Sequence, residues 1–461
     1  MVPLERWIER QYRHSAVAML RSVSAAGIIK SRPGFAQTVR PQKGSIVASP
    51  VLGAYDPEPD YFFHWFRDSA VVIDALRILF QDDAMDGEFF THFADFVHFS
   101  LSLQDLDGRR LSGSPWRDAI ASDYRQYVRQ EADLAAAHGE ALLGETRVNP
   151  DGTLDISKWP RPQYDGPAMR AIVLLQWQNT VRLENELAAE LDALLRADLR
   201  FTLRHWREAS FDIWEEEKGL HYYTLRASAR ALEAGADWFE RRGERSDAAS
   251  CRSEAIAILS ALDGFWREDL QFYKSRILES QAPSTKELDI SVIFAAIHAG
   301  ADSATHSVHD PRMHATLARL EALFDAEYAI NKNRGAARGP AMGRYAGDVY
   351  YSGGAYYFST LAAAEFCFRA AAHSPAMKQL ADRGDAFLET IRAYTPASGE
   401  LSEQFDQQTG VQRSAQQLAW SYAAFITCAH ARRRVIRPGE RGIPPGEPVI
   451  PPGEPVIPPG E

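Results

Sequence analysis

Cysteine is scarce in this chain of 461 residues. Cys251, Cys367 and Cys428 are odd in number and lack the spacing of a zinc knuckle or a C-x-x-C redox pair. Isolated cysteines of this kind usually serve as small buried side chains in helices. The sequence therefore predicts no disulfide framework, and we expect no metal site.

Long apolar runs are also missing. No stretch approaches the ~18 consecutive apolar residues that a membrane-spanning helix needs. The residues up to Arg21 interleave Arg and Glu with apolar Leu4, Trp7 and Ile8. This pattern predicts an amphipathic helix rather than the uninterrupted apolar segment of a signal peptide. We expect a cytoplasmic protein, unless a leader was removed before numbering.

The chain has no excess of positive charge. Its 51 Lys and Arg stand against 62 Asp and Glu, for a net charge of -11. Such a charge repels phosphate backbones and anionic lipid surfaces, so we expect neither nucleic acid nor membrane as a partner. Hydrophobic residues make up 45% and charged residues 25%. That composition is typical of a soluble globular protein and excludes wholesale disorder, collagen and coiled coil.

Proline is concentrated at the end of the chain, where nine of the 25 prolines lie beyond Arg434. An Ile-Pro-Pro-Gly-Glu-Pro-Val repeat with a period of seven starts at Ile443, Ile450 and Ile457. Proline cannot occupy a helix interior, so this heptad is not a coiled coil. We predict a low-complexity tail over 435–461, extended or disordered and without a catalytic role, with a docking segment as the alternative.

Helix-period apolar stretches dominate the remaining 1–434, while strand-like alternation is scarce. Twelve such stretches lie near residues 4–26, 69–81, 87–104, 168–180, 187–206, 223–240, 246–264, 287–299, 312–326, 354–371, 377–393 and 414–431. Six consecutive helical hairpins can close into an all-α (α/α)6 barrel, with one ring of helices inside another. The long connections between alternate helices would then gather at one end and form a pocket. We therefore predict one catalytic domain over 1–434.

The connection before 69–81 holds five aromatic residues between Tyr61 and Phe66, followed by Arg67 and Asp68. A helix N-cap is the simplest role for Asp68 or Ser69. The aromatic residues require another explanation, because a surface loop gains nothing from them unless they pack or bind something.

Two further connections combine carboxylates with tryptophan. One runs from Lys158 to Pro167, and its prolines and glycine fit a structural turn. The other, 211–219, carries three consecutive glutamates that could form a solvated acidic turn. Trp214 directly before them favours a half-buried carboxylate instead, whose pKa an apolar wall would raise so that it could act as an acid.

The last two connections are rich in tyrosine and carboxylate. Five of the 17 tyrosines lie between Tyr345 and Tyr357, and the segment Glu400–Asp406 contains Glu403. Aromatic faces pack on sugar rings while arginines and carboxylates bind their hydroxyls, so we expect a neutral glycan pocket. Glycoside hydrolysis needs two separated carboxyl groups, one as acid and one as base.

Taken together, these connections resemble those of glycoside hydrolase family 15, the glucoamylase family, in order and over nearly the whole chain to about residue 432. The matching motifs are Pro59-Asp60-Tyr61-Phe62 with Trp65, Arg67 and Asp68; Trp159 with Arg161-Pro162-Gln163 and Asp165-Gly166-Pro167; Asp212-Ile213-Trp214-Glu215-Glu216; Gly343-Arg344-Tyr345; Ser402-Glu403-Gln404-Phe405-Asp406; and Trp420-Ser421-Tyr422-Ala423-Ala424. The resemblance implies an (α/α)6 barrel, in agreement with the twelve predicted helices.

The resemblance also implies a role for each matching residue. Glu215 would be the general acid and Glu403 the general base of an inverting exo-hydrolase that releases β-D-glucose from α-glucans or short oligosaccharides without a cofactor. The implied substrate-binding residues are Arg67, Asp68 and Arg344 at the hydroxyls of the terminal glucose, Tyr61 and Trp420 lining its pocket with Tyr61 beside the base, and Trp159 and Glu216 beside the acid and the leaving sugar. Trp65 and Trp214 are further candidates for substrate binding.

Two stretches depart from the family pattern. The chain has Ala346-Gly347-Asp348 where fungal glucoamylases have Pro-Glu-Asp, and Gly354-Ala355-Tyr356 where the family often has Asn-Pro-Trp. Both changes weaken the expected wall beside the leaving sugar, so short or α-1,6-linked glucosides become candidates beside α-1,4 chains.

Two alternatives come from other functional classes. A noncatalytic glycan-binding or regulatory protein could use the same barrel; retention of both Glu215 and Glu403 speaks against it. A polysaccharide lyase on an α/α toroid would need a Tyr/His or metal constellation and an anionic substrate, which the negative charge disfavours.

Overall fold

The computed structural model describes residues 3–53, 58–83, 88–113, 115–300, 305–351, 353–372 and 374–436. The low-complexity segment lies outside the described residues, except for Val435 and Ile436, which end the last helix. None of the described helices has the length and apolar character needed to span a membrane. Cys251, Cys367 and Cys428 are buried and unpaired within helices, as expected.

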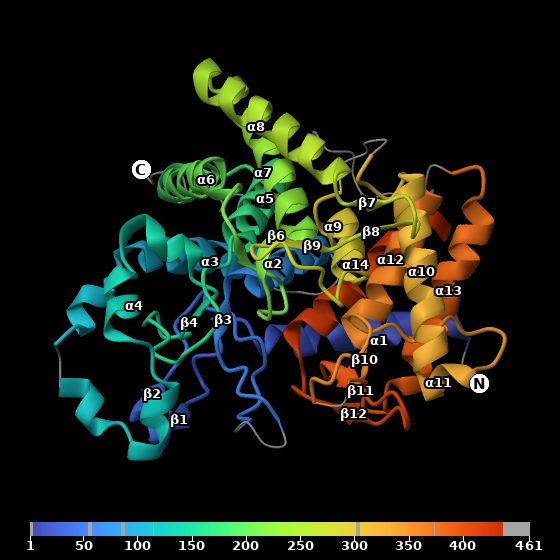
Figure 1. The fold of residues 1–461 in the computed structure, drawn as a ribbon, viewed down its shortest axis with the longest axis horizontal. Coiled ribbons are helices and arrows are strands. Elements are labelled where there is room, and N and C mark those ends of the chain that lie inside the picture. The colour runs from blue at the N-terminus through green and yellow to red at the C-terminus, as the bar shows by residue number, and fades with distance from the viewer. Residues whose placement is uncertain are drawn as a thin grey trace, which may run out of the picture.

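Six helices form a closed inner ring. They are α2 (Phe66–Gln81), α5 (Asp165–Thr180), α7 (Tyr222–Arg241), α9 (Ser291–His298), α12 (Tyr357–Ala371) and α14 (Ala419–Ile436). Each packs against the next in chain order, and α14 packs back on α2 (Figure 1). A ring of this kind buries its helices on all sides: in α12 every side chain except Arg369 is buried.

Six outer helices cover this ring. They are α1 (Leu4–Leu20), α3 (Phe89–Ser102), α6 (Asn185–His205), α8 (Arg245–Asp263), α10 (Pro311–Glu327) and α13 (Met377–Tyr394). In the same order they pack on α14, α2, α5, α7, α9 and α12. Outer helices are amphipathic because one face meets solvent: Leu191, Leu195 and Leu199 of α6 are fully buried, while Ala193 and Arg200 are exposed. The twelve helices confirm the predicted (α/α)6 barrel.

The described connections contain short helices and strands that the sequence pattern did not reveal. The short helices are α4 (Glu131–Ala136) and α11 (Ala329–Lys332). The insertion between α3 and α5, which contains α4, also holds short 3-10 helices, one of them Gly139–Gly144. Ile120, Val128 and Ile156 of this insertion form a small separate core with Phe35. Elements of four to six residues are too short to show a hydrophobic period.

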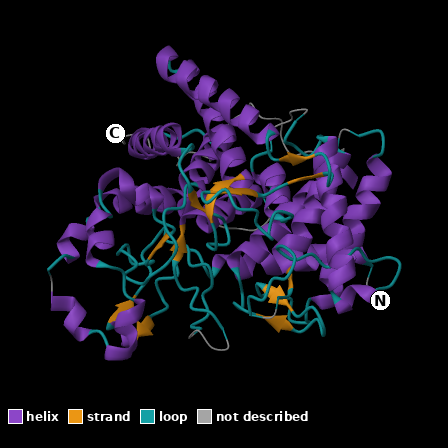
Figure 2. Ribbon diagram, in the orientation of Figure 1, coloured by secondary structure: helices purple, strands orange, loops and turns teal. Residues whose placement is uncertain are grey.

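All strands are antiparallel and two to four residues long, and they lie among the connections (Figure 2). The pairs and triplets are β1 (Lys30–Arg32) with β2 (Gln37–Val39); β3 (His64–Trp65) with β4 (Arg147–Val148); β5 (Ser210–Phe211), β6 (Lys218–His221) and β9 (Arg276–Leu278); β7 (Trp266–Arg267) with β8 (Phe272–Tyr273); and β10 (Ala355–Tyr356), β11 (Gln404–Phe405) and β12 (Gln412–Arg413).

Three of these strands lead directly into inner helices: β3 into α2, β6 into α7 and β10 into α12. Their pairing ties distant connections together, because Trp65 is opposite Arg147 and Tyr356 is opposite Gln404. The connections before the inner helices are thereby clamped to one another at one end of the barrel.

The inner helices begin where these strands end, which corrects one expectation. Helix α2 starts at Phe66 rather than at residue 69, so Arg67 and Asp68 lie in its first turn. The N-cap is Trp65, and the Ser69 hydroxyl donates to the carbonyl of Phe66. Neither Asp68 nor Ser69 is therefore the N-cap, because the β3 pairing holds Trp65 extended up to the first helical residue.

Candidate active site

Glu215 lies in the tight turn between β5 and β6. Its φ is 64°, a left-handed conformation that is uncommon for residues other than glycine and is found often at functional sites. Buried Asp212 holds the turn: its Oδ1 accepts the backbone N–H groups of Glu216 at 2.7 Å and Glu217 at 3.0 Å. Arg276 donates to Asp212 Oδ2 at 3.1 Å. The strained turn indicates that the fold holds the Glu215 side chain in one fixed position.

Two indoles and one guanidinium surround the Glu215 carboxyl group. Trp65 Nε1 donates to Oε1 at 2.8 Å, Trp159 Nε1 donates to Oε2 at 2.6 Å, and Arg67 Nη2 lies 3.5 Å from Oε1. Burial raises the pKa of Glu215, and the charges of Arg67 and Arg147 and the Trp159 N–H oppose this only in part. The group is therefore poised to keep a proton.

Arg147 supports this acid from behind, and sequence reasoning missed it. Its guanidinium lies 3.6 Å from the ring centroid of Trp159 and 4.7 Å from that of Trp65. Asp155 accepts its Nε–H at 2.9 Å. A single arginine in a polar connection carries no sequence signal, since only the pairing of β3 with β4 brings it under both indoles.

Glu403 lies just before β11 and is 8% exposed. Tyr61 Oη donates to its Oε1 at 3.3 Å, and the Ser414 hydroxyl donates to its Oε2. Burial raises the pKa of Glu403 to about 7, although Ser414, Arg344 and Tyr61 oppose the shift. Ser414 was missed as well, because its role depends on the β11–β12 hairpin that folds it back onto Glu403.

The two carboxyl groups belong to one site. Tyr61 contacts Glu403 and Trp65 contacts Glu215, and these two rings meet edge to face with centroids 5.3 Å apart. Tyr61 Oη also shares a hydrogen bond of 2.7 Å with Tyr350 Oη. The structure therefore brings together the two glutamates that the sequence singled out.

Arg67 organises a second cluster beside Glu215. Its Nη1 donates to Asp165 at 3.1 Å, its Nη2 lies 3.3 Å from Asp68 Oδ2, and its guanidinium is 5.5 Å from the ring centroid of Trp420. Burial raises the pKa of Asp68 and of Asp165 against the opposing charge of Arg67. Within the described residues, Arg67 Nε, Asp165 Oδ1 and Trp420 Nε1 have no hydrogen-bond partner, and Asp68 Oδ2 has the ion-pair contact with Arg67 but no hydrogen bond of good geometry. Buried polar atoms seldom stay unpaired, so this cluster has polar groups to offer a ligand.

Arg344 forms a third cluster with Glu216. Both guanidinium contacts to Asp348 measure 2.6 Å, and Arg344 Nη2 lies 3.3 Å from Glu216 Oε1. Tyr345 Oη donates to Glu216 at 2.6 to 2.7 Å, and Lys286 Nζ lies 2.7 Å from Glu216 Oε2. Glu216 is therefore a neutralised anchor beside the acid. Asp348 completes the cluster.

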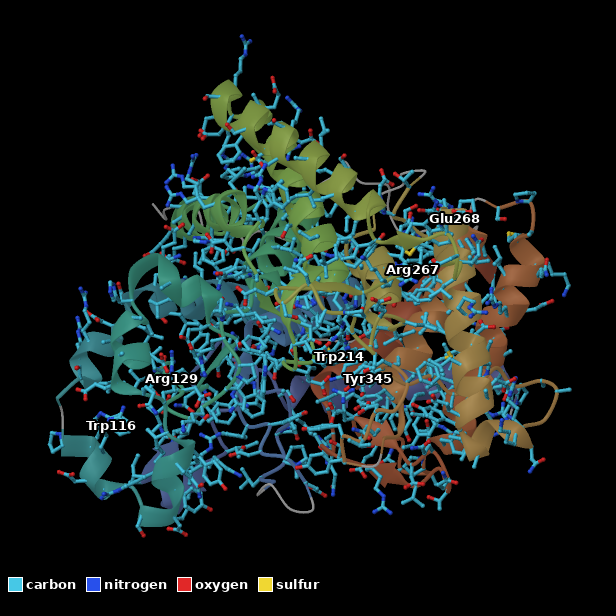
Figure 3. The ribbon with its side chains drawn as sticks, in the orientation of Figure 1. Trp116, Arg129, Trp214, Arg267, Glu268 and Tyr345 are labelled. Atoms are coloured by element: carbon cyan, nitrogen blue, oxygen red, sulfur yellow. The ribbon has the colours of Figure 1, made fainter. Side chains whose placement is uncertain are left out.

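Trp214 does not form the wall of the acid in the way its position in the sequence indicated. Its Nε1 donates to Asp289 Oδ2 at 2.9 Å, and its ring stacks on Phe358 at 6.3 Å. Trp214 and Tyr345 lie close together at the middle of the molecule (Figure 3), with the Arg344 guanidinium 5.2 Å and 5.1 Å from their ring centroids. The indoles that bind the acid are those of Trp65 and Trp159, because the left-handed turn directs Glu215 away from its neighbour.

One of the two altered stretches also lies elsewhere than expected. Ala355 and Tyr356 form β10 and are 0% exposed, so they cannot contact a sugar directly. Tyr356 Oη donates to Asp348 and thus acts behind Arg344. Gly354, Ala355 and Tyr356 are all buried where β10 pairs with β11, and a linear motif does not reveal this pairing.

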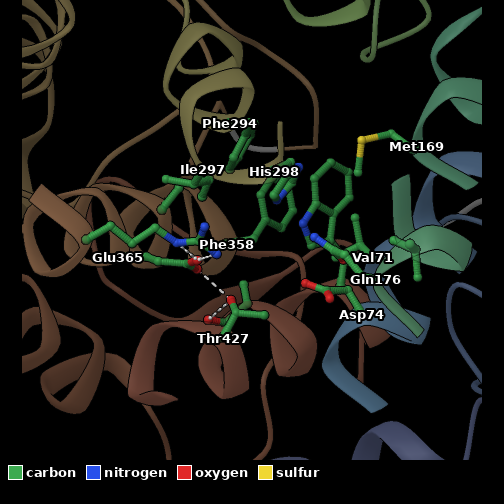
Figure 4. Close-up of a pocket in the computed structure, with 15 residues that line it drawn as sticks. Val71, Asp74, Met169, Gln176, Phe294, Ile297, His298, Phe358, Glu365 and Thr427 are labelled. Atoms are coloured by element: carbon green, nitrogen blue, oxygen red, sulfur yellow. Dashed lines mark hydrogen bonds and ion pairs between the residues drawn. The ribbon is translucent and has the colours of Figure 1, made fainter. Parts of the chain in front are cut away.

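A small cavity lies among the inner helices α2, α5, α9, α12 and α14, and Phe358 and Trp420 are among the residues that line it. Figure 4 shows Phe358 together with other lining residues. Its volume of about 20 Å³ has room for roughly one water molecule, not for a sugar. At its edge, Glu365 accepts from Arg369 at 2.7 Å and from Thr427 at 2.5 Å. We interpret it as part of the barrel packing. Within the described residues, no group of His, Cys, Asp and Glu side chains is arranged to hold a metal ion.

Known proteins resemble this chain over most of its length. It is 27% identical over 477 residues to a probable glucoamylase of Schizosaccharomyces pombe, covering 94% of this chain and 92% of that protein. It is 25% identical over 476 residues to Glucoamylase 1 of Rhizopus oryzae, covering 93% of this chain and 71% of that protein.

Solved structures agree. The family 15 glucoamylase from Hypocrea jecorina matches with a TM-score of 0.76 and 25% identity, over 94% of this chain and 73% of that chain. The Hormoconis resinae glucoamylase matches with a TM-score of 0.74 and 27% identity, over 93% and 74%. The family model described as glycosyl hydrolases family 15 matches residues 114–376 and 370–430. The chain therefore belongs to glycosyl hydrolase family 15 and is a glycoside hydrolase.

Proposed function

We propose that this enzyme is an inverting exo-hydrolase of α-glucosides that releases β-D-glucose from non-reducing ends, with Glu215 as general acid and Glu403 as general base. The observation that carries the proposal is the pair of buried carboxyl groups on separate connections, joined through the contacting rings of Tyr61 and Trp65. The similar proteins named glucoamylases support the choice of α-glucans as substrate class.

The proposed reaction needs two proton transfers, one at each of the two groups. Glu215 donates its proton to the glycosidic oxygen as the bond from that oxygen to the anomeric carbon breaks. Glu403 accepts a proton from the water that attacks the same carbon from the opposite face, which inverts its configuration. Glu215 is left ionised and Glu403 protonated, and exchange with solvent restores both.

The surrounding groups suit these two roles. Tyr61 and Ser414 both donate to Glu403, which favours the ionised form that a base requires. Burial raises the pKa of Tyr61 well above its ordinary value, so its hydroxyl stays a neutral donor. The unpaired Arg67 Nε and Trp420 Nε1, with the adjacent Asp68 carboxylate, support the proposed contacts of these residues to the terminal glucose.

Two isosteric variants test the assignment of acid and base. Each should lose about 10² to 10⁴ in rate, the usual worth of a positioned proton-transfer group. Glu215→Gln should lose most with poor leaving groups and retain more activity on α-glucosyl fluoride, which needs little acid help. Glu403→Gln should be slow on both substrates.

Proton NMR of the first product, measured before mutarotation, completes this test. β-Glucose is expected from the wild type. Release of α-glucose would contradict inversion, and equal sensitivity of both variants to the leaving group would contradict the roles. An unaltered rate in both variants would favour a noncatalytic role for this glutamate pair.

We also propose that short or α-1,6-linked substrates rival long α-1,4 chains. Gly347 supplies no side chain, and a Cβ built there would meet nothing within 4 Å, so the bend it occupies is open. The Asp348 carboxylate is already occupied by Arg344. Each missing hydrogen bond to a sugar hydroxyl is worth about 0.5 to 1.5 kcal/mol, so a few of them change linkage preference by about tenfold.

The measurement is kcat/KM on isomaltose and on the series from maltose to maltoheptaose. We expect isomaltose within about tenfold of maltose and a shallow rise with chain length. A steep rise in kcat/KM to maltoheptaose, with isomaltose hardly cleaved, would contradict this proposal and indicate a preference for long α-1,4 chains.

A further inference from the structure

A second cavity lies away from the two glutamates. Its lining residues come from the start of α2, from α3, α5 and α6, and from the insertion between α3 and α5. Helices α3 and α6 lie on one side of the barrel (Figure 1). Its volume of about 310 Å³ falls at the lower end of the ~300 to 1,000 Å³ typical of small-molecule sites. The cavity is therefore large enough for a ligand, unlike the small one in the barrel centre.

The inner wall of this cavity is apolar. Phe66, Leu103, Leu142 and Val148 line it, and all four are at most 5% exposed. Aliphatic and aromatic surface of this kind favours an apolar ligand body over a sugar with hydroxyls on every edge.

The outer rim carries positive charge from one face of α6. Ala197, Arg200 and Arg204 line the cavity at helical spacing. Arg204 pairs with Glu140 at 2.7 Å, and both side chains are substantially exposed. Arg200 has no hydrogen bond or close ion pair within the described residues; Glu244, which it influences from a distance, is already bound by Arg196 at 2.6 Å.

Deeper in the cavity the charge of Arg170 is balanced, but two of the described polar side chains still lack hydrogen-bond partners. Arg170 is held by Asp198 at 2.7 and 2.9 Å, so its charge is neutralised. Ser100 Oγ and Gln104 Nε2, on two other lining residues, have no hydrogen-bond partner within the part of the chain that the structure describes. Asp198 pairs with Arg170 and Glu140 with Arg204, which leaves Arg200 as the lining arginine with no close carboxylate partner within the described residues.

We propose that this cavity is a binding site for a small amphipathic carboxylate, with its apolar body against Phe66, Leu103 and Val148 and its carboxylate at Arg200 and Arg204. Apolar walls provide the burial and the cationic rim fixes the orientation, as in other small-molecule sites. A carboxylate also matches the fork of an arginine side chain. The proposal does not depend on the proposed reaction.

Isothermal titration of the full chain with sodium octanoate tests the site. Acetate supplies the charge without the apolar body, and 1-octanol supplies the body without the charge. We expect saturable binding of one octanoate per chain, with both controls at least about tenfold weaker.

Two variants locate the ligand. Ala197→Leu should fill the cavity from a helix that tolerates leucine, and Arg200→Gln should remove the arginine that has no close carboxylate partner from an exposed position. Each should weaken octanoate binding by about tenfold or more. The matched controls are Ala193→Leu, exposed on the same helix, and Arg10→Gln, exposed on α1, which should bind as the wild type does.

Several outcomes would overturn the proposal. Absence of saturable octanoate binding would do so directly. Equal binding of acetate would indicate a simple cationic surface, and equal binding of octanol an uncharged cavity. Unchanged affinity in both Ala197→Leu and Arg200→Gln would place the ligand elsewhere. Thermal melting of each variant separates loss of binding from loss of folding.

Discussion

Glu215 and Glu403 have different hydrogen-bond donors although burial raises the pKa of both. Two indole N–H groups bind Glu215, whereas two hydroxyl groups bind Glu403. A hydroxyl can donate to the ionised base and still accept from water, while an indole N–H can only donate. The difference suits a base that must hold and activate a water molecule.

The pH dependence of the reaction should follow Glu403. Protonated Glu403 cannot accept a proton from water, so kcat/KM should fall as the pH drops below about 7. The Ser414 hydroxyl stabilises the ionised form, and Ser414→Ala should raise the pKa further. We expect the acid limb of the pH profile to move up by about one unit.

A buried serine elsewhere controls for this measurement. Ser421 donates to the backbone carbonyl of Ser402 at 2.8 Å and has no carboxylate to stabilise. Ser421→Ala should leave the acid limb in place. An acid limb that is unchanged or moves down in Ser414→Ala would show that the hydroxyl does not set the pKa of Glu403.

At the scale of elements, the β5–β6 hairpin positions Glu215, the proposed acid. Asp212 has 2% exposure and binds two backbone amides of the turn as well as Arg276. Burial would raise its pKa, but Arg276 and the other partners lower it, so it stays ionised in the fold. The turn can then keep Glu215 at a positive φ, which costs about 1 kcal/mol or more.

Asp212→Asn should therefore impair both stability and turnover. The variant loses the charge that Arg276 and the two amides bind, which should cost about 1 to 3 kcal/mol of unfolding free energy. Denaturant unfolding measures this loss, and kcat on a small glucoside should fall with it. In the control Asp151→Asn, a turn aspartate that accepts from Thr153 outside this hairpin, kcat should be unchanged. A wild-type kcat in Asp212→Asn would contradict the role of the turn.

The helices could be predicted from the sequence, whereas the strands could not. Apolar residues recur at helical spacing over whole turns, and twelve stretches marked the twelve long helices within a few residues. Strands of two to four residues have no room for alternation. The missed pairing of β3 with β4 explains both the early start of α2 and the absence of Arg147 from the predicted site.

At the scale of the whole molecule, the ring closes where α14 meets α2 and α1. Asp82, at the end of α2, accepts from Tyr12 of α1 at 2.6 Å and pairs with Arg433 of α14. His430 Nδ1 of α14 lies 3.2 Å from the same carboxylate. Burial would raise the pKa of Asp82, but these partners lower it below the ordinary value of 3.8. One carboxylate at the end of α2 thus contacts both the outer helix α1 and the last inner helix α14.

Loss of this carboxylate should destabilise the closed barrel. Asp82→Asn should cost about 1 to 3 kcal/mol and lower Tm at pH 7. Because the folded-state pKa is depressed, ionised Asp82 adds stability above the unfolded value and loses it as pH falls below 3.8. The Tm difference from wild type should therefore shrink toward pH 3.

The control is Asp118→Asn, an exposed carboxylate in the insertion, which should leave Tm unchanged. A Tm difference that stays constant down to pH 3 would indicate that the charge of Asp82 does not join the helices.

The sequence by itself determined the helical barrel and singled out Glu215 and Glu403 as the proposed acid and base, because helix periodicity and contiguous motifs are local properties of the chain. Tertiary structure decided which side chains serve these glutamates. Arg147, Ser414 and Asp348 reach the site through strand pairing and loop folding, and Trp214 turns from Glu215 toward Asp289 because the turn is left-handed. These contacts depend on strand pairing, on the folding of a loop or on one backbone angle, and none of these leaves a periodic trace in the sequence.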